Sequence, residues 1–326
     1  MAMVAFVFPG QGSQHVGMGT DIAAAFPEAR ETFDTASALL GCDFLDLCRN
    51  GPEAELTRTV NAQPAILTVS TAIFRVLRSK GLVPQMAAGL SLGEYSALVA
   101  AGSLVFEDAV RLVRARAVYM QEAVPEGEGA MAAIIGLSEG DVRDICGRSS
   151  DEGTVEPANF NCPGQIIISG RAAAVQKAVS LARKAGGSGI PLKVSAPFHC
   201  SLMQPAATRL KADLDEVEIR SPSIAVFANV SAGMVTSPAE IREALLRQVH
   251  MPVLWERSVR EMISRGARVF VEVGPGKTLA NLIRKIDRTV AVFSVNARRG
   301  DGLEGGLISC GILTEERPSS PGRPGV

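Results

Sequence analysis

The segment Gly-Leu-Ser-Leu-Gly at residues 89–93 places Ser91 between two glycines. A short apolar run, residues 86–90, precedes this serine, and a segment with helical apolar spacing follows it. A G-x-S-x-G between a strand and a helix predicts a nucleophile elbow, a sharp turn that exposes the serine hydroxyl. At the start of the following helix, the backbone N–H of Leu92 can point at a developing oxyanion. We therefore predict covalent acyl chemistry on Ser91.

A serine nucleophile needs a base, and the chain contains three histidines, His15, His199 and His250. His199 lies in a loop, residues 196–200, just before a predicted helix. Functional residues concentrate in such loops. His15 follows the first loop of the chain, and His250 lies near a predicted helix end. We predict that His199 is the general base and rank the other two below it.

Two further polar residues keep more than one interpretation when only their types and positions are considered. The loop at residues 8–14 lacks the third glycine of a dinucleotide-binding loop, because His15 stands at that position. Its Gln11 either presents a backbone N–H to a site or belongs to a plain tight turn. Arg116 shares a predicted helix with two other arginines, and an arginine chosen by type alone is usually solvated.

The elements that must position these residues alternate between strands and helices. Apolar runs at 4–8 and 86–90 predict buried strands, and apolar spacing predicts helices at 64–80 and 106–123. Pro64 is expected in the first turn of its helix. Further on, the pattern predicts strands at 223–229, 267–276 and 289–295 and helices at 201–215, 238–249, 253–265 and 278–286. This alternation predicts a parallel sheet covered by helices.

The middle of the chain follows a different order, strand-helix-strand-strand-helix-strand, which is typical of a ferredoxin-like unit. The expected strands are 130–136, 153–161, 163–170 and 189–196, and the expected helices are 138–146 and 171–186. We predict an inserted small domain at 127–197 within a core formed by 1–126 and 198–296. The remaining residues, 297–326, are rich in Gly, Pro, Arg and Ser and predict a disordered tail.

Composition and charge argue against several classes of protein. The 326 residues, 47% apolar and 21% charged, suit one large soluble domain or a large domain carrying a smaller one. A net charge of −1 gives no global attraction to nucleic acid or to an anionic membrane. No apolar run reaches the roughly 20 residues that span a bilayer, and the first residues lack the basic segment of a signal peptide. The scattered cysteines predict reduced thiols in a cytoplasmic protein without a metal site.

Several further segments carry a resemblance to a known family. They are FPGQGSQ (8–14), GLSLGEYSALVAAG (89–102), RAVYMQEAVPEGEGAM (116–131), NFNCPGQIIISG (159–170), HCSLM (199–203), RQVHMPVLW (247–255) and EVGPGKTL (272–279). Over about residues 1–296 the chain resembles bacterial malonyl-CoA:acyl carrier protein transacylases, which are related to acyltransferase domains of fatty acid and polyketide synthases. The resemblance implies an α/β fold, an α/β-hydrolase-like parallel-sheet core with an inserted ferredoxin-like small domain.

The resemblance also implies catalytic roles for residues at matching positions. Ser91 is expected to be the nucleophile and His199 the general base. Gln11 and Leu92 are expected to supply the N–H groups of the oxyanion hole. Gln248 matches a position whose backbone carbonyl orients the histidine.

Three other matching positions concern the substrate. Arg116 matches the arginine that binds the free carboxylate of malonate. Asn159 and Asn161 match positions lining the cleft for the acyl group and coenzyme A. The resemblance leaves no position for a metal or a tightly bound cofactor.

The activity implied is transfer of malonyl from malonyl-CoA to the phosphopantetheine thiol of acyl carrier protein, through a Ser91 ester in ping-pong order. Such transfer supplies extender units for fatty acid or polyketide synthesis, and we expect a cytoplasmic monomer. Acyl carrier proteins are usually acidic, so the docking surface should be basic. Its candidate residues are Lys277, Arg284, Lys285 and Arg288.

Three alternatives stay open. An α/β-hydrolase-type esterase or thioesterase shares the elbow and base but usually has an acid between them in chain order. An acyltransferase for another extender, such as methylmalonyl, is disfavoured by Phe198, which is common before the base in malonyl-selective synthase domains. A binding protein with a vestigial elbow is disfavoured because Ser91, His199 and Arg116 are all present. Leu90 replaces a histidine frequent in the family, with little effect expected on the chemistry.

Overall fold

The computed structural model describes residues 3–296, and the predicted tail at 297–326 lies outside the described residues. A six-stranded sheet has the order β10-β9-β1-β2-β7-β8. Its strands are β1 (Met3–Phe8), β2 (Met86–Gly89), β7 (Ala225–Phe227), β8 (Met234–Val235), β9 (Ala267–Val273) and β10 (Ala291–Val295). Neighbouring strands from β10 to β7 are parallel, and β8 pairs antiparallel with β7. The predicted α/β class with a parallel core is confirmed.

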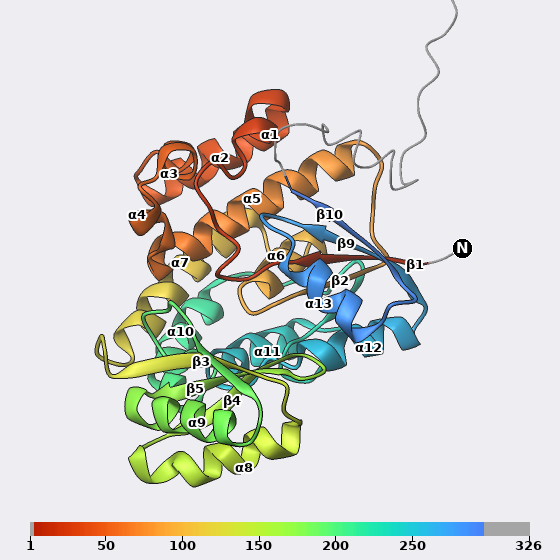
Figure 1. Ribbon diagram of the computed structural model, residues 1–326. Coiled ribbons are helices and arrows are strands. Elements are labelled where there is room, and N and C mark those ends of the chain that lie inside the picture. Colours follow the sequence, from red (N-terminus) through yellow and green to blue (C-terminus); the bar gives the residue numbers. More distant parts are fainter. Residues whose placement is uncertain (1–2, 297–326) are drawn as a thin grey trace, which may run out of the picture.

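Helices cover both faces of this sheet (Figure 1). They are α1 (Thr20–Ala25), α2 (Pro27–Leu40), α3 (Phe44–Asn50), α4 (Glu53–Thr57), α5 (Thr59–Ser79), α6 (Gly93–Ala100), α7 (Phe106–Glu122), α10 (Gln204–Glu216), α11 (Pro238–His250), α12 (Trp255–Ser264) and α13 (Thr278–Ile286). Alternate residues of β1 enter two cores. Phe6 and Phe8 pack with α5, and Ala5 and Val7 pack with α12 and α13. Burial on both faces explains why β1 is a continuous apolar run.

A second, antiparallel sheet lies below the main one in Figure 1, covered by two helices. Its elements are β3 (Gly129–Ile135), α8 (Glu139–Ser149), β4 (Val155–Cys162), β5 (Gln165–Arg171), α9 (Ala172–Lys184) and β6 (Ser188–Pro191). The spatial order β4-β5-β3-β6 with this chain order is ferredoxin-like. The domain boundaries at 127 and 197 stay a prediction.

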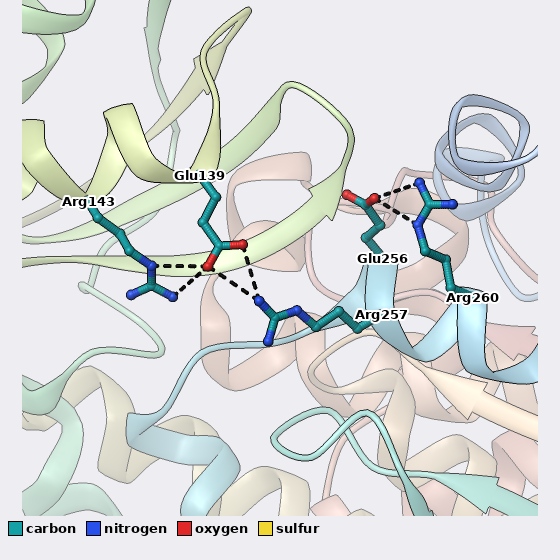
Figure 2. A network of polar contacts seen from close by, with 5 residues as sticks. All are labelled: Glu139, Arg143, Glu256, Arg257 and Arg260. Carbon is teal, nitrogen blue, oxygen red and sulfur yellow. Dashed lines mark hydrogen bonds and ion pairs between the residues drawn. The ribbon is translucent and has the colours of Figure 1, made fainter.

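Backbone hydrogen bonds join the antiparallel sheet to the helical layer of the main sheet. Phe160 N donates to Val253 O at 2.9 Å, and Val253 N donates to Ala158 O at 2.8 Å, so β4 is bonded to the segment before α12. Beside this contact, Arg257 of α12 lies 3.2 Å from Glu139 of α8 (Figure 2). Exposed ion pairs of this kind contribute about 0–1 kcal/mol, so the backbone bonds and the buried side chains carry most of the contact.

The prediction for Pro64 is wrong, because α5 begins at Thr59 and Pro64 lies inside the helix. A proline there leaves the carbonyl four residues earlier, that of Val60, without its helical donor. The side chain of Arg114 in α7 donates to this carbonyl instead. By length and composition α5 is the one described helix that could cross a membrane, but 83% of its apolar window is buried inside the protein.

Strand β6 is also shorter than predicted, since it ends at Pro191 rather than at residue 196. Beyond the strand the chain reaches the core helices, where Ser195 has polar partners. Ser195 bonds through its hydroxyl to Gln121 of α7 and lies 3.3 Å from the hydroxyl of Thr59. This departure brings residues 192–194 to the wall of the cavity described below.

Candidate active site

Ser91 lies in the turn between β2 and α6 with a φ of 54°, a left-handed conformation rare for residues other than glycine. A Cβ atom on Gly89 would lie 1.9 Å from the Gly93 carbonyl oxygen, and one on Gly93 would lie 2.0 Å from Phe8 O. Both positions therefore require glycine. This geometry is that of a nucleophile elbow at the carboxyl end of a parallel strand.

The side chain of Asn229, just after β7, holds both sides of this turn. Its Oδ1 accepts from Ser91 N at 2.7 Å, and its Nδ2 donates to Gly89 O at 2.6 Å. These bonds offset the cost of the left-handed conformation, about 1–3 kcal/mol for such a residue. The elbow is thus fixed by a residue 138 positions away in the chain.

His199 lies directly against the serine. Its Nε2 is 2.6 Å from Ser91 Oγ, and its Nδ1 is 2.7 Å from the backbone carbonyl oxygen of Gln248. Because a carbonyl oxygen can only accept, Nδ1 carries the proton and Nε2 is free to accept the serine proton. Burial, together with the nearby charge of Arg116, lowers the pKa of His199 to about 3. The imidazole is therefore neutral at physiological pH, as a general base must be.

Arg116 is a buried side chain, 1% exposed, rather than the solvated arginine that its type alone favours. Its Nη1 donates to Gln63 Oε1 at 2.8 Å. Its Nη2 donates to Gln248 Oε1 at 2.9 Å and to Ser91 Oγ at 3.1 Å. Among the residues described, its buried Nε–H has no partner. The guanidinium thus lies against the nucleophile in the cavity wall.

A cavity of about 500 Å³ surrounds the serine. The predicted site residues that line it are Gln11, Ser91, Leu92, Arg116, Asn159, Asn161 and His199. Gln248 lies behind this surface and is fully buried. The loop carrying Gln11 touches the elbow directly, since a Cβ atom on Gly10 would lie 2.4 Å from Leu90 O. Two lining groups, Gln11 Oε1 and Asn161 Oδ1, are buried without a hydrogen-bond partner in the described part of the chain.

Comparison with known proteins identifies the family of the chain. A family model described as "Acyl transferase domain" matches residues 5–297. The chain belongs to this acyltransferase family. It is 46% identical to a malonyl CoA-acyl carrier protein transacylase of Bacillus subtilis (strain 168), over 91% of this chain and 94% of the relative. It is 48% identical to the protein of that name from Escherichia coli (strain K12), over 91% of this chain and 96% of the relative.

Solved structures of related transacylases have the same fold as this acyltransferase. The malonyl CoA-acyl carrier protein transacylase of Coxiella burnetii superposes with a TM-score of 0.92 at 43% identity, over 96% of this chain and 98% of that one. A malonyl-transacylase in complex with its type II PKS acyl-carrier protein has a TM-score of 0.91 at 43% identity, over 95% and 99%.

The other two histidines of the acyltransferase lie elsewhere. Neither His15 nor His250 is among the described residues that line the cavity. Nδ1 of His15 lies 3.1 Å from the Val16 carbonyl oxygen, and His250 is the last residue of α11. The structure thus leaves His199 as the histidine that meets the elbow serine.

Three residues that support the site were not predicted from the sequence: Gln63, Glu94 and Asn229. Gln63 is a buried amide inside an apolar helix, and Asn229 is a polar residue at the carboxyl end of a predicted strand. Glu94 is an acidic residue in an otherwise apolar helix start, and it is 2% exposed. A polar side chain within an apolar run was the available signal in each case. It points to burial with a partner but does not identify that partner.

Proposed function

We propose that this acyltransferase moves a malonyl group from malonyl-CoA to the phosphopantetheine thiol of acyl carrier protein, through an ester on Ser91. The observation that carries the proposal is the buried guanidinium of Arg116, 3.1 Å from Ser91 Oγ in the same cavity. An unpaired buried charge is costly, so this site favours an acyl group with a free carboxylate. The names of the relatives, and the solved complex of one malonyl-transacylase with its carrier protein, support the same substrate and partner.

In the first half of the reaction, His199 Nε2 takes the hydroxyl proton while Ser91 Oγ attacks the thioester carbonyl carbon. The backbone N–H groups of Gln11 and Leu92 stabilise the tetrahedral oxyanion. Loss of one such donor typically costs about 3–4 kcal/mol in the transition state. When the intermediate collapses, the C–S bond breaks, and the coenzyme A thiolate receives the proton from His199. Malonyl remains on Ser91 as an ester.

The second half repeats these steps with the carrier protein. The phosphopantetheine thiol gives its proton to His199, and its sulfur attacks the ester carbonyl carbon. The C–O bond to Ser91 breaks, and Oγ regains its proton from the imidazole. The Gln248 carbonyl oxygen stabilises the imidazolium in both halves, since it accepts the Nδ1–H that lies opposite the transferred proton. Asn159 and Asn161 line the cleft that holds the acyl chain and the pantetheine arm.

Phe198 narrows the choice of extender. Its ring lines the cavity beside His199 and is 7% exposed. A methyl branch on the acyl group would need room on this wall, and packed interiors yield little space without cost. We therefore propose malonyl rather than methylmalonyl as the acyl group.

The direct test is a transfer assay with malonyl-CoA and holo-acyl carrier protein. We expect malonyl-carrier protein to form in equal amount to the coenzyme A released. Release of free malonate without acylated carrier protein would instead identify a thioesterase. A faster reaction with methylmalonyl-CoA would contradict the proposed choice of extender.

The docking surface for an acidic carrier protein is proposed to lie on α13. Thr278 and Leu282 of this helix line the cavity. Lys285 is exposed on the same helix, and Lys277 is exposed just before it. The pantetheine arm of a carrier protein bound here would start beside the cavity. Arg284 and Arg288 are exposed nearby.

Reversal of one of these charges should weaken carrier-protein binding selectively. We expect Lys285→Glu to raise KM for carrier protein about three- to tenfold, because an attractive charge becomes a repulsive one. KM for malonyl-CoA should not change, because the donor makes no use of the docking surface. Lys184→Glu, which changes an exposed residue at the end of α9, is the matched control and should leave both constants unchanged. An equal rise in KM for carrier protein and for malonyl-CoA in Lys285→Glu would refute the docking surface.

We further propose that the enzyme is a cytoplasmic monomer that supplies extender units for fatty acid or polyketide synthesis. The described residues contain no group of three His, Cys, Asp or Glu side chains that could hold a metal ion. The proposed steps use protein side chains and backbone N–H groups, and they need no bound cofactor.

A further inference from the structure

Glu94 is a buried carboxylate behind the active site that takes no part in the steps above. It lies in the first turn of α6 and is 2% exposed. Its Oε2 accepts from Gln248 Nε2 at 2.8 Å and from the backbone N–H of Asn229 at 3.1 Å. Burial raises the pKa of Glu94 to about 7, against the effects of these two bonds and of the Arg116 charge. Burying a carboxylate is costly, so a function for it is expected.

Gln248 connects this carboxylate to the substrate-binding arginine. Its Nε2 donates to Glu94 Oε2 and, at 2.9 Å, to the backbone carbonyl oxygen of Ser91. Its Oε1 accepts from Arg116 Nη2 at 2.9 Å. An amide has two orientations related by a flip of its oxygen and nitrogen. The reversed orientation would point an NH₂ group at the guanidinium, which is repulsive, and an oxygen at Glu94, which is repulsive while Glu94 is ionised.

We infer that Glu94 is a positioning residue for acyl selection: it fixes the Gln248 amide, whose Oε1 holds the Arg116 guanidinium in place for the free carboxylate of the acyl group. Gln63 Oε1 and Ser91 Oγ accept the other two bonds that orient the guanidinium. This inference rests on the proposed function. It adds a residue that never touches the substrate but determines the orientation of one that does.

Glu94 also supports the elbow, and any test must separate that contribution. Its second bond goes to the backbone N–H of Asn229, whose side chain holds the turn at Ser91. A general disturbance of the elbow would slow every reaction of the serine. Loss of guanidinium positioning would instead slow reaction with malonyl donors while sparing neutral donors. The ratio of the two rates is therefore the informative quantity.

The test compares Glu94→Leu with the isosteric Glu94→Gln. Rates of Ser91 acylation are measured with malonyl-CoA, with acetyl-CoA and with a neutral sulfonyl fluoride that reacts with the serine hydroxyl. We expect Glu94→Leu to lower the ratio of the malonyl to the acetyl acylation rate about ten- to a hundredfold. This factor corresponds to the free energy of one hydrogen bond to a charged group. Its reaction with the sulfonyl fluoride should fall by a much smaller factor, since the two bonds of the Asn229 side chain still hold the turn. Glu94→Gln should restore most of the ratio, because its amide oxygen can accept both bonds.

Two outcomes would overturn the inference. A wild-type ratio in Glu94→Leu would show that Glu94 does not position the guanidinium. An equal loss in all three reactions would leave Glu94 only a structural role at the elbow. If Glu94→Leu does not fold, Gln248→Met replaces it, since the backbone carbonyl that orients His199 is kept, and an unchanged ratio in that variant contradicts the inference. A wild-type enzyme without malonyl preference would instead contradict the proposed function, so the two failures are distinguishable.

Discussion

Replacement of Arg116 by alanine should abolish the preference for malonyl over acetyl donors. In the proposed complex a malonyl carboxylate pairs with the buried guanidinium, whereas an acetyl group would leave that charge without a partner. Such a deletion within a buried pair costs about 3–5 kcal/mol. At about 1.4 kcal/mol per tenfold, the ratio of the two acylation rates should fall by a hundredfold to a few thousandfold. The measurement is single-turnover acylation of Ser91 by malonyl-CoA and by acetyl-CoA.

Arg111→Ala is the matched control, because Arg111 lies on the same helix but is exposed. It should keep the wild-type ratio, since its nearest charged partner is Asp108 on the surface, at 3.2 Å. An unchanged ratio in Arg116→Ala would remove this arginine from acyl selection.

Replacement of His199 by alanine should slow Ser91 acylation by about a thousandfold, within the range typical of a lost general base. Without the imidazole, nothing at 2.6 Å from Ser91 Oγ accepts the hydroxyl proton. The rate is measured in a single turnover with malonyl-CoA. His15→Ala, which alters a histidine away from the cavity, should keep the wild-type rate. A His199→Ala enzyme with near-normal acylation would show that another group is the base.

The pH dependence of the same rate follows from the lowered pKa of His199. Protonation of the imidazole stops it from accepting the serine proton, so the rate falls as the pH drops through the pKa. Burial and the Arg116 charge lower this pKa to about 3. The acylation rate should therefore stay flat as the pH falls through the ordinary histidine value of about 6.5. In Arg116→Ala the decline should move to higher pH, because a positive charge beside the imidazole is lost.

The elbow at Ser91 was predictable from sequence because its constraint is local. Gly89 and Gly93 are needed by contacts within the same turn and with the adjacent strand, and a five-residue pattern records both requirements. Arg116 was different. Its type and helix position favour a solvated side chain, and family resemblance rather than pattern pointed to the carboxylate.

Residues whose partners are far away in the chain could not be found in this way. Glu94 bonds to residues 135 and 154 positions further on, so its role exists only after α6, β7 and α11 have packed together. The position of Pro64 was predicted wrongly for a related reason. A proline normally marks a helix start, but the Arg114 side chain supplies the donor that its preceding turn lacks. The helices between residues 20 and 57 were not predicted at all.

Intact-protein and peptide mass spectrometry after brief incubation with malonyl-CoA tests the central claim most directly. The account predicts a mass increase of one malonyl group on the peptide containing Ser91, absent in Ser91→Ala and removed when holo-acyl carrier protein is added. Malonyl-carrier protein that forms while Ser91 stays unmodified, or while another residue carries the malonyl group, would contradict a covalent Ser91 intermediate.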